Sequence, residues 1–192
     1  MKIAVFVSGN GSNLQCIIDN CKSKQIKGIE ISMVIADRVC YAIQRANIEK
    51  IDCVIVDRKE KWQHDIHLLL KERNVQLIVL AGFLSILDNK FCSLWKNKII
   101  NIHPSLLPKY GGKGMYGLKV HQAVIDNKEK ESGATVHFVT TNIDEGDIIL
   151  QEKTAVKEEA TATSLQELIH PIEHRLLVKS LKLIYAKTQS TH

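Results

Sequence analysis

The sequence predicts an α/β fold, in which a single doubly wound domain is built on a mostly parallel sheet with an antiparallel edge. Short apolar runs of strand length, such as residues 3–7 and 77–81, alternate with segments whose apolar residues recur at helical spacing. Glycine follows each of these two runs within two residues, and continuous apolar runs of this kind are typical of buried parallel strands. A chain in which strands and helices alternate folds into a parallel sheet covered by helices on both faces.

The expected strands and helices follow one another in chain order. We predict parallel strands at residues 3–7, 29–36, 53–56, 77–82 and 99–103. Helices are predicted between them at residues 13–21, 42–49, 62–73 and 88–96. A glycine-rich loop at 109–114 then leads to a helix at 119–126. Strands at 134–139 and 148–151 are predicted to pair as a hairpin-like unit at the sheet edge.

The C-terminal segment predicts an amphipathic helix that contains a proline. Ser164 and Glu167 have the spacing of a capping box, which opens a helix. Pro171 removes a backbone donor inside the pattern, so we expect it to kink the helix or split it. Residues 187–192 are expected to be loose. The apolar face is expected to run through Leu165, Leu168, Ile169, Ile172 and Leu176.

Length and composition indicate one globular domain that covers residues 1–192. Hydrophobic residues make up 45% of the 192 residues and charged residues 24%, which is ordinary for a soluble protein with a sizeable core. The net charge of +5 favours anionic ligands, but the basic residues are scattered, so we expect small-molecule substrates and no nucleic acid. No stretch has the length of a membrane span, and the first apolar run is too short for a signal peptide. We therefore expect a cytoplasmic protein that binds no membrane.

The cysteines and most histidines suggest no metal site. The five cysteines form no CxxC pair and are expected to be reduced. His64, His67 and His121 lie in helical patterns and are expected at the surface, whereas His137 lies on a strand face and could be a core residue. No pair of histidines has the spacing of a metal site, so no metal is expected. A monomer and a homodimer are both compatible with the sequence.

A glycine-rich turn, Ser8-Gly9-Asn10-Gly11-Ser12-Asn13, lies between the first strand and the first helix. Its amide groups would point out of a helix N-terminus, where anions bind, phosphate above all. A dinucleotide fingerprint would need glycine at Leu14, and a P-loop would need Gly-Lys-Ser/Thr, so the turn favours a monophosphate. A tight turn with an ordinary helix cap is the alternative.

The stretch that ends at His103-Pro104 carries two polar side chains in alternation. Residues two apart in a strand share a face, so Asn101 and His103 are expected to project together, and Pro104 ends the ladder. An imidazole carries a proton near neutral pH, and an asparagine amide can donate to a carbonyl oxygen that becomes anionic. Because ligands bind at strand ends in open α/β sheets, the pair is a candidate active site; a structural histidine is the alternative.

An acidic turn at residues 140–147 lacks the spacing of a calcium loop. If this turn folds against the strand at 99–103, Asp144 would orient the ring of His103 and raise its pKa. The spacing alone does not establish that contact, and a solvated turn is the alternative.

Three blocks together resemble the folate-dependent phosphoribosylglycinamide formyltransferase family. They are residues 8–13, the Asn-Ile-His-Pro-Ser-Leu-Leu-Pro block at 101–108, and residues 135–140 with Asp144. The resemblance extends over nearly the whole chain, in family-like order and spacing. The block at 101–108 is shared by the wider group of enzymes that use formyltetrahydrofolate, and the N-terminal block is more specific. The resemblance implies formyl transfer from the co-substrate 10-formyltetrahydrofolate to the amine of 5'-phosphoribosylglycinamide in purine (IMP) biosynthesis, with no metal.

Site residues carry over from the family by position. The catalytic residues implied are Asn101, His103 and Asp144. The residues implied to bind the ribonucleotide are Gly11, Ser12, Asn13, His170, Pro171, Ile172 and Glu173. The residues implied to bind the formyl folate are Lys59, Leu84, Ser85, Ile86, Leu87, Asn101, Thr140, Thr141, Asn142, Ile143 and Asp144. In this assignment the N-terminal half binds the phosphoribosyl group and the C-terminal half binds the folate.

The resemblance also implies a mechanism and exposes two departures. The amine would attack the formyl carbon directly, Asn101 and protonated His103 would stabilise the tetrahedral oxyanion, and Asp144 would keep His103 charged. Many members have arginine where this chain has Ser85, so one contact to the folate is expected to be missing. Lys59 stands where a basic residue often meets the folate, and lysine is not equivalent to arginine there.

Three other functions share part of the pattern. Methionyl-tRNA formyltransferases add a C-terminal domain, and formyltetrahydrofolate deformylases add an N-terminal one. We expect neither, since the chain ends soon after its last helix and its first strand starts at Lys2. A non-catalytic phosphate-binding module would explain the turn at Gly11 but not the set of Asn101, His103 and Asp144.

Overall fold

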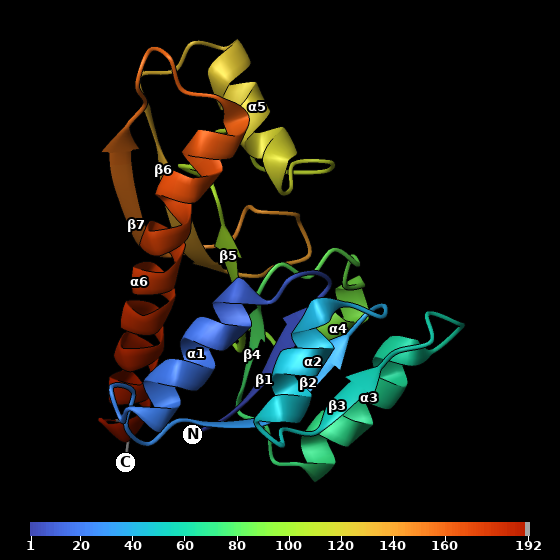
Figure 1. The fold of residues 1–192 in the computed structure, drawn as a ribbon. Coiled ribbons are helices and arrows are strands. Elements are labelled where there is room, and N and C mark those ends of the chain that lie inside the picture. The colour runs from blue at the N-terminus through green and yellow to red at the C-terminus, as the bar shows by residue number, and fades with distance from the viewer. Residues whose placement is uncertain (191–192) are drawn as a thin grey trace.

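A seven-stranded sheet runs through the protein in the order β3-β2-β1-β4-β5-β6-β7 (Figure 1). The structure is a computed structural model and describes residues 1–190. The strands are Lys2–Val7 (β1), Glu30–Ala36 (β2), Cys53–Ile55 (β3), Leu77–Leu80 (β4), Ile99–His103 (β5), Glu131–Phe138 (β6) and Ile148–Ala155 (β7). The first five strands pair in parallel, and β6 and β7 pair antiparallel, which confirms the predicted sheet with its antiparallel edge.

Helices cover both faces of this sheet. They are Ser12–Lys22 (α1), Tyr41–Ile48 (α2), Trp62–Glu72 (α3), Asn89–Leu94 (α4), Leu118–Asp126 (α5) and Ala162–Gln189 (α6). Apolar side chains of α1, α2, α5 and α6 pack on one face, and those of α3 and α4 pack on the other. Both faces of the parallel strands are therefore buried, which is why these strands are continuous apolar runs.

Strand β1 contributes apolar side chains to the hydrophobic cores on both faces of the sheet. Ile3, Val5 and Val7 belong to the core under α1 and α6, whereas Ala4 and Phe6 belong to the core under α3 and α4. Successive side chains of a strand point to opposite faces, so a run with apolar residues at every position is needed at the centre of the sheet.

The carboxyl ends of β1, β4 and β5 meet at the same edge of the sheet. Phe6 lies opposite Leu80, and Leu80 lies opposite Asn101 on the next strand. The strand order reverses between β1 and β4, since β2 and β3 extend to one side and β5 to the other. Such a reversal is the place where open α/β sheets bind ligands.

The antiparallel strands are longer than predicted. The predicted strands at 134–139 and 148–151 extend to Glu131–Phe138 and Ile148–Ala155. Most of the additional residues are polar, and Gly133 and Ala155 are the exceptions, so the sequence has no apolar run that would indicate a strand there. They pair through the backbone at the sheet edge, where Lys153 Nζ also lies 2.8 Å from Glu131 Oε1.

The C-terminal helix α6 differs from its prediction at its start, middle and end. Thr161 caps it and forms the capping box with Ser164, so the predicted Ser164–Glu167 box is wrong. Pro171 lies inside one continuous helix, and Leu168 is 42% exposed rather than on the apolar face. Residues 187–189 are helical rather than loose, and residues 191–192 of the predicted tail lie outside the described residues.

Burial on both sides of Pro171 explains why α6 is not split. Leu165 and Ile169 before the proline, and Ile172 and Leu176 after it, all pack in the same core. Each fully buried side chain of this size contributes about 1.5–3 kcal/mol, so together they outweigh the roughly 3 kcal/mol that an internal proline costs.

Other sequence expectations concern the cysteines and the membrane. All five cysteines are free thiols, and four of them are only partly buried. Over residues 1–190, no helix combines the length and the apolar character that a bilayer span needs.

We expect Leu177→Ala to lower the free energy of unfolding by about 2–5 kcal/mol, because Leu177 is fully buried between α6 and the sheet. Leu183→Ala on the same helix is the control, since Leu183 is 45% exposed and its loss should cost about 0.5 kcal/mol or less. Urea unfolding of both variants measures the difference. Equal losses would mean that α6 does not pack as described.

Candidate active site

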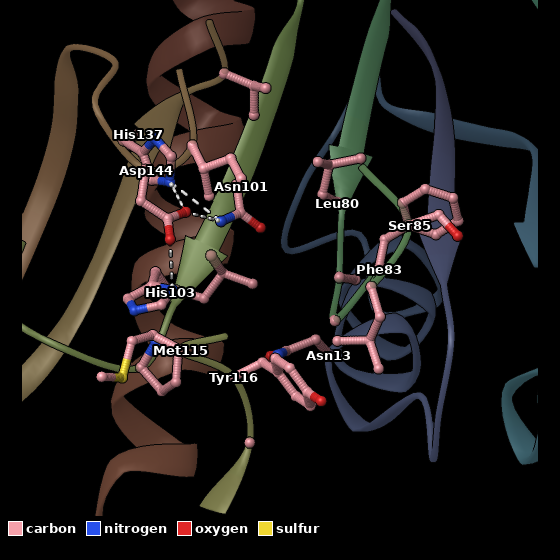
Figure 2. Close-up of a pocket in the computed structure, with 18 of the residues that line it drawn as sticks. Asn13, Leu80, Phe83, Ser85, Asn101, His103, Met115, Tyr116, His137 and Asp144 are labelled. Atoms are coloured by element: carbon pink, nitrogen blue, oxygen red, sulfur yellow. Dashed lines mark hydrogen bonds and ion pairs between the residues drawn. The ribbon is translucent and has the colours of Figure 1, made fainter. Parts of the chain in front are cut away.

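A cavity of about 660 Å³ opens where the carboxyl ends of β1, β4 and β5 meet (Figure 2). In Figure 2 a polar cluster lies on one side of the cavity, and Leu80, Phe83 and Ser85 lie across from it. The volume is within the range of small-molecule pockets. The lining comes mainly from residues 9–13, 80–87, 101–104, 112–117 and 139–144, together with His121, His137, Gln166, His170 and Glu173.

The turn between β1 and α1 forms one end of the cavity. Gly11 precedes the first residue of α1 with φ 78°, and no side chain caps the helix. The first amide groups of a helix have no intrahelical acceptor, so those of α1 are free to bind a ligand. Gly11 to Asn13 all line the cavity, and the arrangement is suited to an anion.

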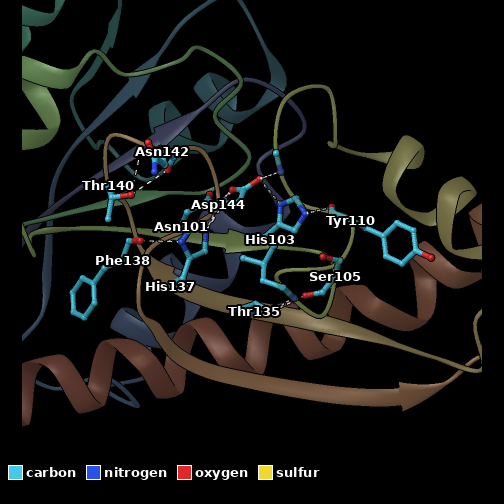
Figure 3. Close-up of polar contacts among 12 residues, drawn as sticks. Asn101, His103, Ser105, Tyr110, Thr135, His137, Phe138, Thr140, Asn142 and Asp144 are labelled. Atoms are coloured by element: carbon cyan, nitrogen blue, oxygen red, sulfur yellow. Dashed lines mark hydrogen bonds and ion pairs between the residues drawn. The ribbon is translucent and has the colours of Figure 1, made fainter.

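A polar cluster forms at the end of β5, where Asn101, His137 and Asp144 meet (Figure 3). The amide nitrogen of Asn101 lies 3.1 Å from His137 Nε2 and donates to Asp144 Oδ1 at 3.4 Å. His137 Nδ1 lies 2.9 Å from the carbonyl oxygen of Phe138. That carbonyl can only accept, so Nδ1 of His137 carries a proton, and Nε2 lies 3.5 Å from Asp144 Oδ1 as well as beside Asn101.

His103 lies beside this cluster with an acceptor near each ring nitrogen. Nε2 lies 2.8 Å from the carbonyl oxygen of Tyr110, so Nε2 donates to it. Nδ1 lies 3.7 Å from Asp144 Oδ2, beyond hydrogen-bond range. Burial lowers the pKa of His103 below its ordinary value, and the raising effects of Asp144 and Tyr110 only partly offset it. The expected effect of Asp144 is thus present in direction, but burial outweighs it and leaves the ring neutral at pH 7.

The backbone holds Asp144 in this position. Asp144 has φ 58°, a left-handed conformation that a non-glycine residue rarely adopts, and its Oδ2 accepts from the amide of Gly112 at 2.9 Å. Burial by itself would raise the pKa of Asp144, but His137, His103 and the Gly112 amide lower it below its ordinary value. The carboxylate is therefore ionised at neutral pH, and its negative charge faces both histidines.

A buried carboxyl group lies opposite the turn, on α6. Glu173 is 6% exposed, and burial raises its pKa to about 7. Asn13 Nδ2 donates to Glu173 Oε1 at 3.5 Å, and His170 Nε2 lies 3.8 Å from Glu173 Oε2. Asn13 Oδ1 is buried without a hydrogen-bond partner. This end of the cavity thus offers a free acceptor beside a carboxyl group that is partly protonated at pH 7.

The wall formed by residues 84–87 is fixed from behind by polar contacts. Ser8 Oγ accepts from the amide of Leu84 at 2.8 Å. Ser85 Oγ donates to Asp37 Oδ2 at 2.7 Å and lies 3.5 Å from Arg58 Nη1. Asp37 is almost fully buried and also forms two hydrogen bonds of 2.9 Å with Arg38. Ser85 therefore connects this wall to the buried carboxylate of Asp37, whose ion-pair partner Arg38 is exposed.

Most of the predicted site residues line this one cavity, and three do not. Lys59 pairs with Asp57 at 2.6 Å and lies in a separate hollow of about 470 Å³, which is lined by residues 58–64 and by residues of 88–94. Ile172 is buried in the core, and Pro171 is exposed on α6. The predicted residues that line the cavity are Gly11, Ser12, Asn13, Leu84, Ser85, Ile86, Leu87, Asn101, His103, Thr140, Thr141, Asn142, Ile143, Asp144, His170 and Glu173.

Two lining histidines were not identified from the sequence. His121 was predicted at the surface, but it is 1% exposed, and burial lowers its pKa to about 4. His137 faces Asn101 because the two residues are opposite in the antiparallel pairing of β5 and β6. The alternation of Thr135 and His137 was the available signal, but a sequence does not show strand register. Over residues 1–190, no group of three or more histidine, cysteine or acidic side chains could hold a metal ion.

Comparisons with known proteins agree with this architecture. The sequence matches the formyl transferase family over residues 1–181. The crystal structure of phosphoribosylglycinamide formyltransferase from Anaplasma phagocytophilum has a TM-score of 0.88 and 36% identity, over 97% of this chain and 88% of that chain. The same enzyme from Bacillus halodurans has a TM-score of 0.89 and 28% identity, over 98% and 97% of the two chains.

Curated relatives differ in length. Phosphoribosylglycinamide formyltransferase of Escherichia coli is 37% identical over 161 residues, which are 81% of this chain and 74% of that protein. The chloroplastic enzyme of Arabidopsis thaliana is 33% identical over 184 residues, 93% of this chain and 63% of that protein. The human trifunctional purine biosynthetic protein adenosine-3 is 34% identical over 193 residues. The match covers 97% of this chain but only 18% of the human protein.

We expect Glu173→Gln to change how stability depends on pH. A carboxyl group with a raised pKa binds its proton more tightly in the folded state, so its contribution to stability falls as pH rises from about 4.5 to 7. The glutamine variant has no carboxyl group at this position, so it does not lose stability in this way. Its free energy of unfolding relative to the wild type should rise by about 3 kcal/mol between these two pH values. Urea unfolding at several pH values measures it.

The matched control for that experiment is Glu167→Gln, which removes an exposed carboxylate from the same helix. Its stability difference from the wild type should stay constant across the same pH range. A constant difference for Glu173→Gln as well would contradict the raised pKa.

Proposed function

The chain belongs to the formyl transferase family, and we propose that it transfers the formyl group of 10-formyltetrahydrofolate to the amine of 5'-phosphoribosylglycinamide. The products are formylglycinamide ribonucleotide and tetrahydrofolate, in cytoplasmic purine biosynthesis. Support comes from the relatives of purine biosynthesis described above and from the chemistry of the cavity residues.

One observation carries the proposal: a single cavity joins the anion-binding turn to the cluster of Asn101, His103 and Asp144. A reaction between two metabolites needs both held side by side, because positioning two reactants can supply about 7–11 kcal/mol of the barrier. The turn suits the phosphate of the acceptor, and the cluster suits a carbonyl group that gains negative charge. A phosphate-binding module without catalysis would not need the second feature.

Each substrate is assigned a part of the lining. The phosphate of the ribonucleotide is assigned to Gly11, Ser12 and Asn13, and its ribose and glycinamide to His170 and Glu173. The formyl folate is assigned to the walls at 84–87 and 140–144, which lie on the same cavity. Lys59 is left with a more distant role, at the solvent end of the folate. Both halves of the chain then contact each substrate.

The transfer requires stabilisation of negative charge at the formyl oxygen. The acceptor amine forms a bond to the formyl carbon, and the carbonyl oxygen becomes an oxyanion. The amide nitrogen of Asn101 makes two contacts, to His137 at 3.1 Å and to Asp144 at 3.4 Å. The N–H directed at Asp144 makes the weaker contact and can donate to the oxyanion instead. Such a donor is effective because it is held in place before the charge develops.

The reaction also requires the transfer of a proton. The amine loses one proton when the new C–N bond forms, and N10 of the folate gains one when the old C–N bond breaks. Burial lowers the pKa of His103 and so favours the neutral ring, in which Nε2 donates to Tyr110 and Nδ1 can accept a proton. The developing oxyanion is a second negative charge near His103, besides that of Asp144. It raises the pKa of His103, so the protonated ring becomes the charged partner of the intermediate.

We expect His103→Ala to lower kcat by about 10²–10³-fold, because it removes the ring that carries the proton and faces the oxyanion. His64→Ala is the control, since His64 is exposed on α3 and outside the cavity. Formyl transfer is followed spectrophotometrically with purified protein. A His103→Ala variant that folds normally and keeps the wild-type rate would refute the assigned role.

The acceptor is tested by omitting it. We expect the wild-type protein to consume the formyl folate only when phosphoribosylglycinamide is present, because the amine is the nucleophile. Consumption without the ribonucleotide would indicate a deformylase, and transfer only to charged initiator tRNA would indicate the tRNA enzyme. Either result would overturn the proposal.

A further inference from the structure

Arg45 lies on α2, outside the lining of the cavity, and reaches the back of the anion-binding turn. Its Nε donates to the carbonyl oxygen of Asn10 at 2.8 Å, and its Nη2 donates to Asn10 Oδ1 at 2.8 Å. The third nitrogen, Nη1, donates to Gln15 Oε1 at 3.1 Å in the first turn of α1. One planar guanidinium group therefore ties the turn to the helix whose amides face the cavity.

Helix α2 also contacts the turn through Ala42. The amide of Ala42 donates to the carbonyl oxygen of Gly9 at 3.1 Å. A Cβ atom on Gly11 would lie 2.6 Å from Cβ of Ala42 and 3.4 Å from Cδ of Arg45, so the two segments are packed as closely as glycine allows. Each residue from Gly9 to Gly11 thus touches α2, and the shape of the turn depends on that helix.

The charge of Arg45 is not neutralised by its partners. All three acceptors are uncharged amide or carbonyl oxygens. The guanidinium lies 4.9 Å from the ring centre of Tyr41, and within the described part of the chain no ion pair involves Arg45. An arginine side chain stays protonated at any physiological pH, so a full positive charge stands behind the turn.

The lining itself supplies little positive charge at this end of the cavity. Within residues 1–190, Lys113 is the one lysine or arginine among the lining residues, and it lies in the loop after β5 rather than in the turn. A phosphate dianion at Gly11, Ser12 and Asn13 would therefore meet backbone amides in front and a single arginine behind them. Because Arg45 is itself only partly exposed, its attraction for such a phosphate is screened less than that of a fully exposed side chain.

We propose that Arg45 is a positioning residue for the phosphate site: it holds the turn in its binding shape and supplies, from behind, the positive charge that the lining lacks. The inference rests on the proposed function only for the identity of the ligand, a phosphate monoester. Anion binding at the turn does not require formyl transfer to take place.

The test is a titration with inorganic phosphate, followed by the backbone amide NMR signals of Gly11, Ser12 and Asn13. We expect Arg45→Gln to raise the Kd for phosphate about tenfold, since it removes the charge and weakens the hydrogen bonds. Arg45→Lys keeps the charge but loses the planar fork, so its Kd should rise about threefold. Arg73→Gln is the control, because it removes the same charge from the end of α3, on the other face of the sheet.

Steady-state kinetics give a second measurement that a general loss of structure would not reproduce. In Arg45→Gln, KM for phosphoribosylglycinamide should rise about tenfold while kcat stays within about twofold, because the lost interaction acts on binding. The dependence of KM on ionic strength should also be weaker than in the wild type and in Arg45→Lys.

The possible outcomes separate this inference from the proposed function. An unchanged Kd in Arg45→Gln, or a wild-type protein that does not bind phosphate, would overturn the inference. Equal Kd values for Arg45→Gln and Arg45→Lys would overturn the role of the charge. If the glutamine variant does not fold, Arg45→Lys is compared with the wild type, and an unchanged Kd would overturn the positioning role. If the phosphate Kd values are as predicted but the protein shows no formyl transfer, the role of Arg45 is upheld and the proposed reaction is refuted.

Discussion

The antiparallel pairing of β6 with β5 is the constraint on which the candidate active site depends. It places His137 opposite Asn101, and the following turn then returns to the same strand end. The return is tight, because Gly146 lies so close to the carbonyl oxygen of Phe138 that a side chain would not fit. Asp144 takes a left-handed conformation within this turn and comes within hydrogen-bond distance of Asn101, 43 residues earlier in the chain. Strand β6 ends at Phe138, opposite Ile100, so the turn that follows has to bend back along β5 to reach Asn101.

Burial governs the charges in the cavity. It lowers the pKa values of His103 and His121 and raises that of Glu173, so each of these groups is less charged than it would be in water. Asp144 is the exception, because histidines and a backbone amide surround its carboxylate. In such surroundings a charge that develops on a ligand interacts strongly with the few dipoles and charges that are held in place.

Residues from both halves of the chain line one cavity. The wall at 84–87 from the first half and the turn at 140–144 from the second line the same space, and Asn13 meets Glu173 from the far end of the sequence. Helix α6 makes this possible, since it packs on both β6 and α1 and places the carboxyl group of Glu173 beside Asn13.

The sequence by itself determined the order of strands and helices, the glycine-rich turn before α1 and the pair of Asn101 and His103. These depend on local features: runs of apolar residues, glycine at a strand end, and two polar side chains on one face of a strand. Only the tertiary structure decided strand register, the burial of His121, the position of His137 opposite Asn101, the start of α6 at Thr161 and the distance of Lys59 from the cavity. Each of them depends on contacts between segments far apart in the chain, because burial and register follow from what a residue packs against rather than from its neighbours in sequence.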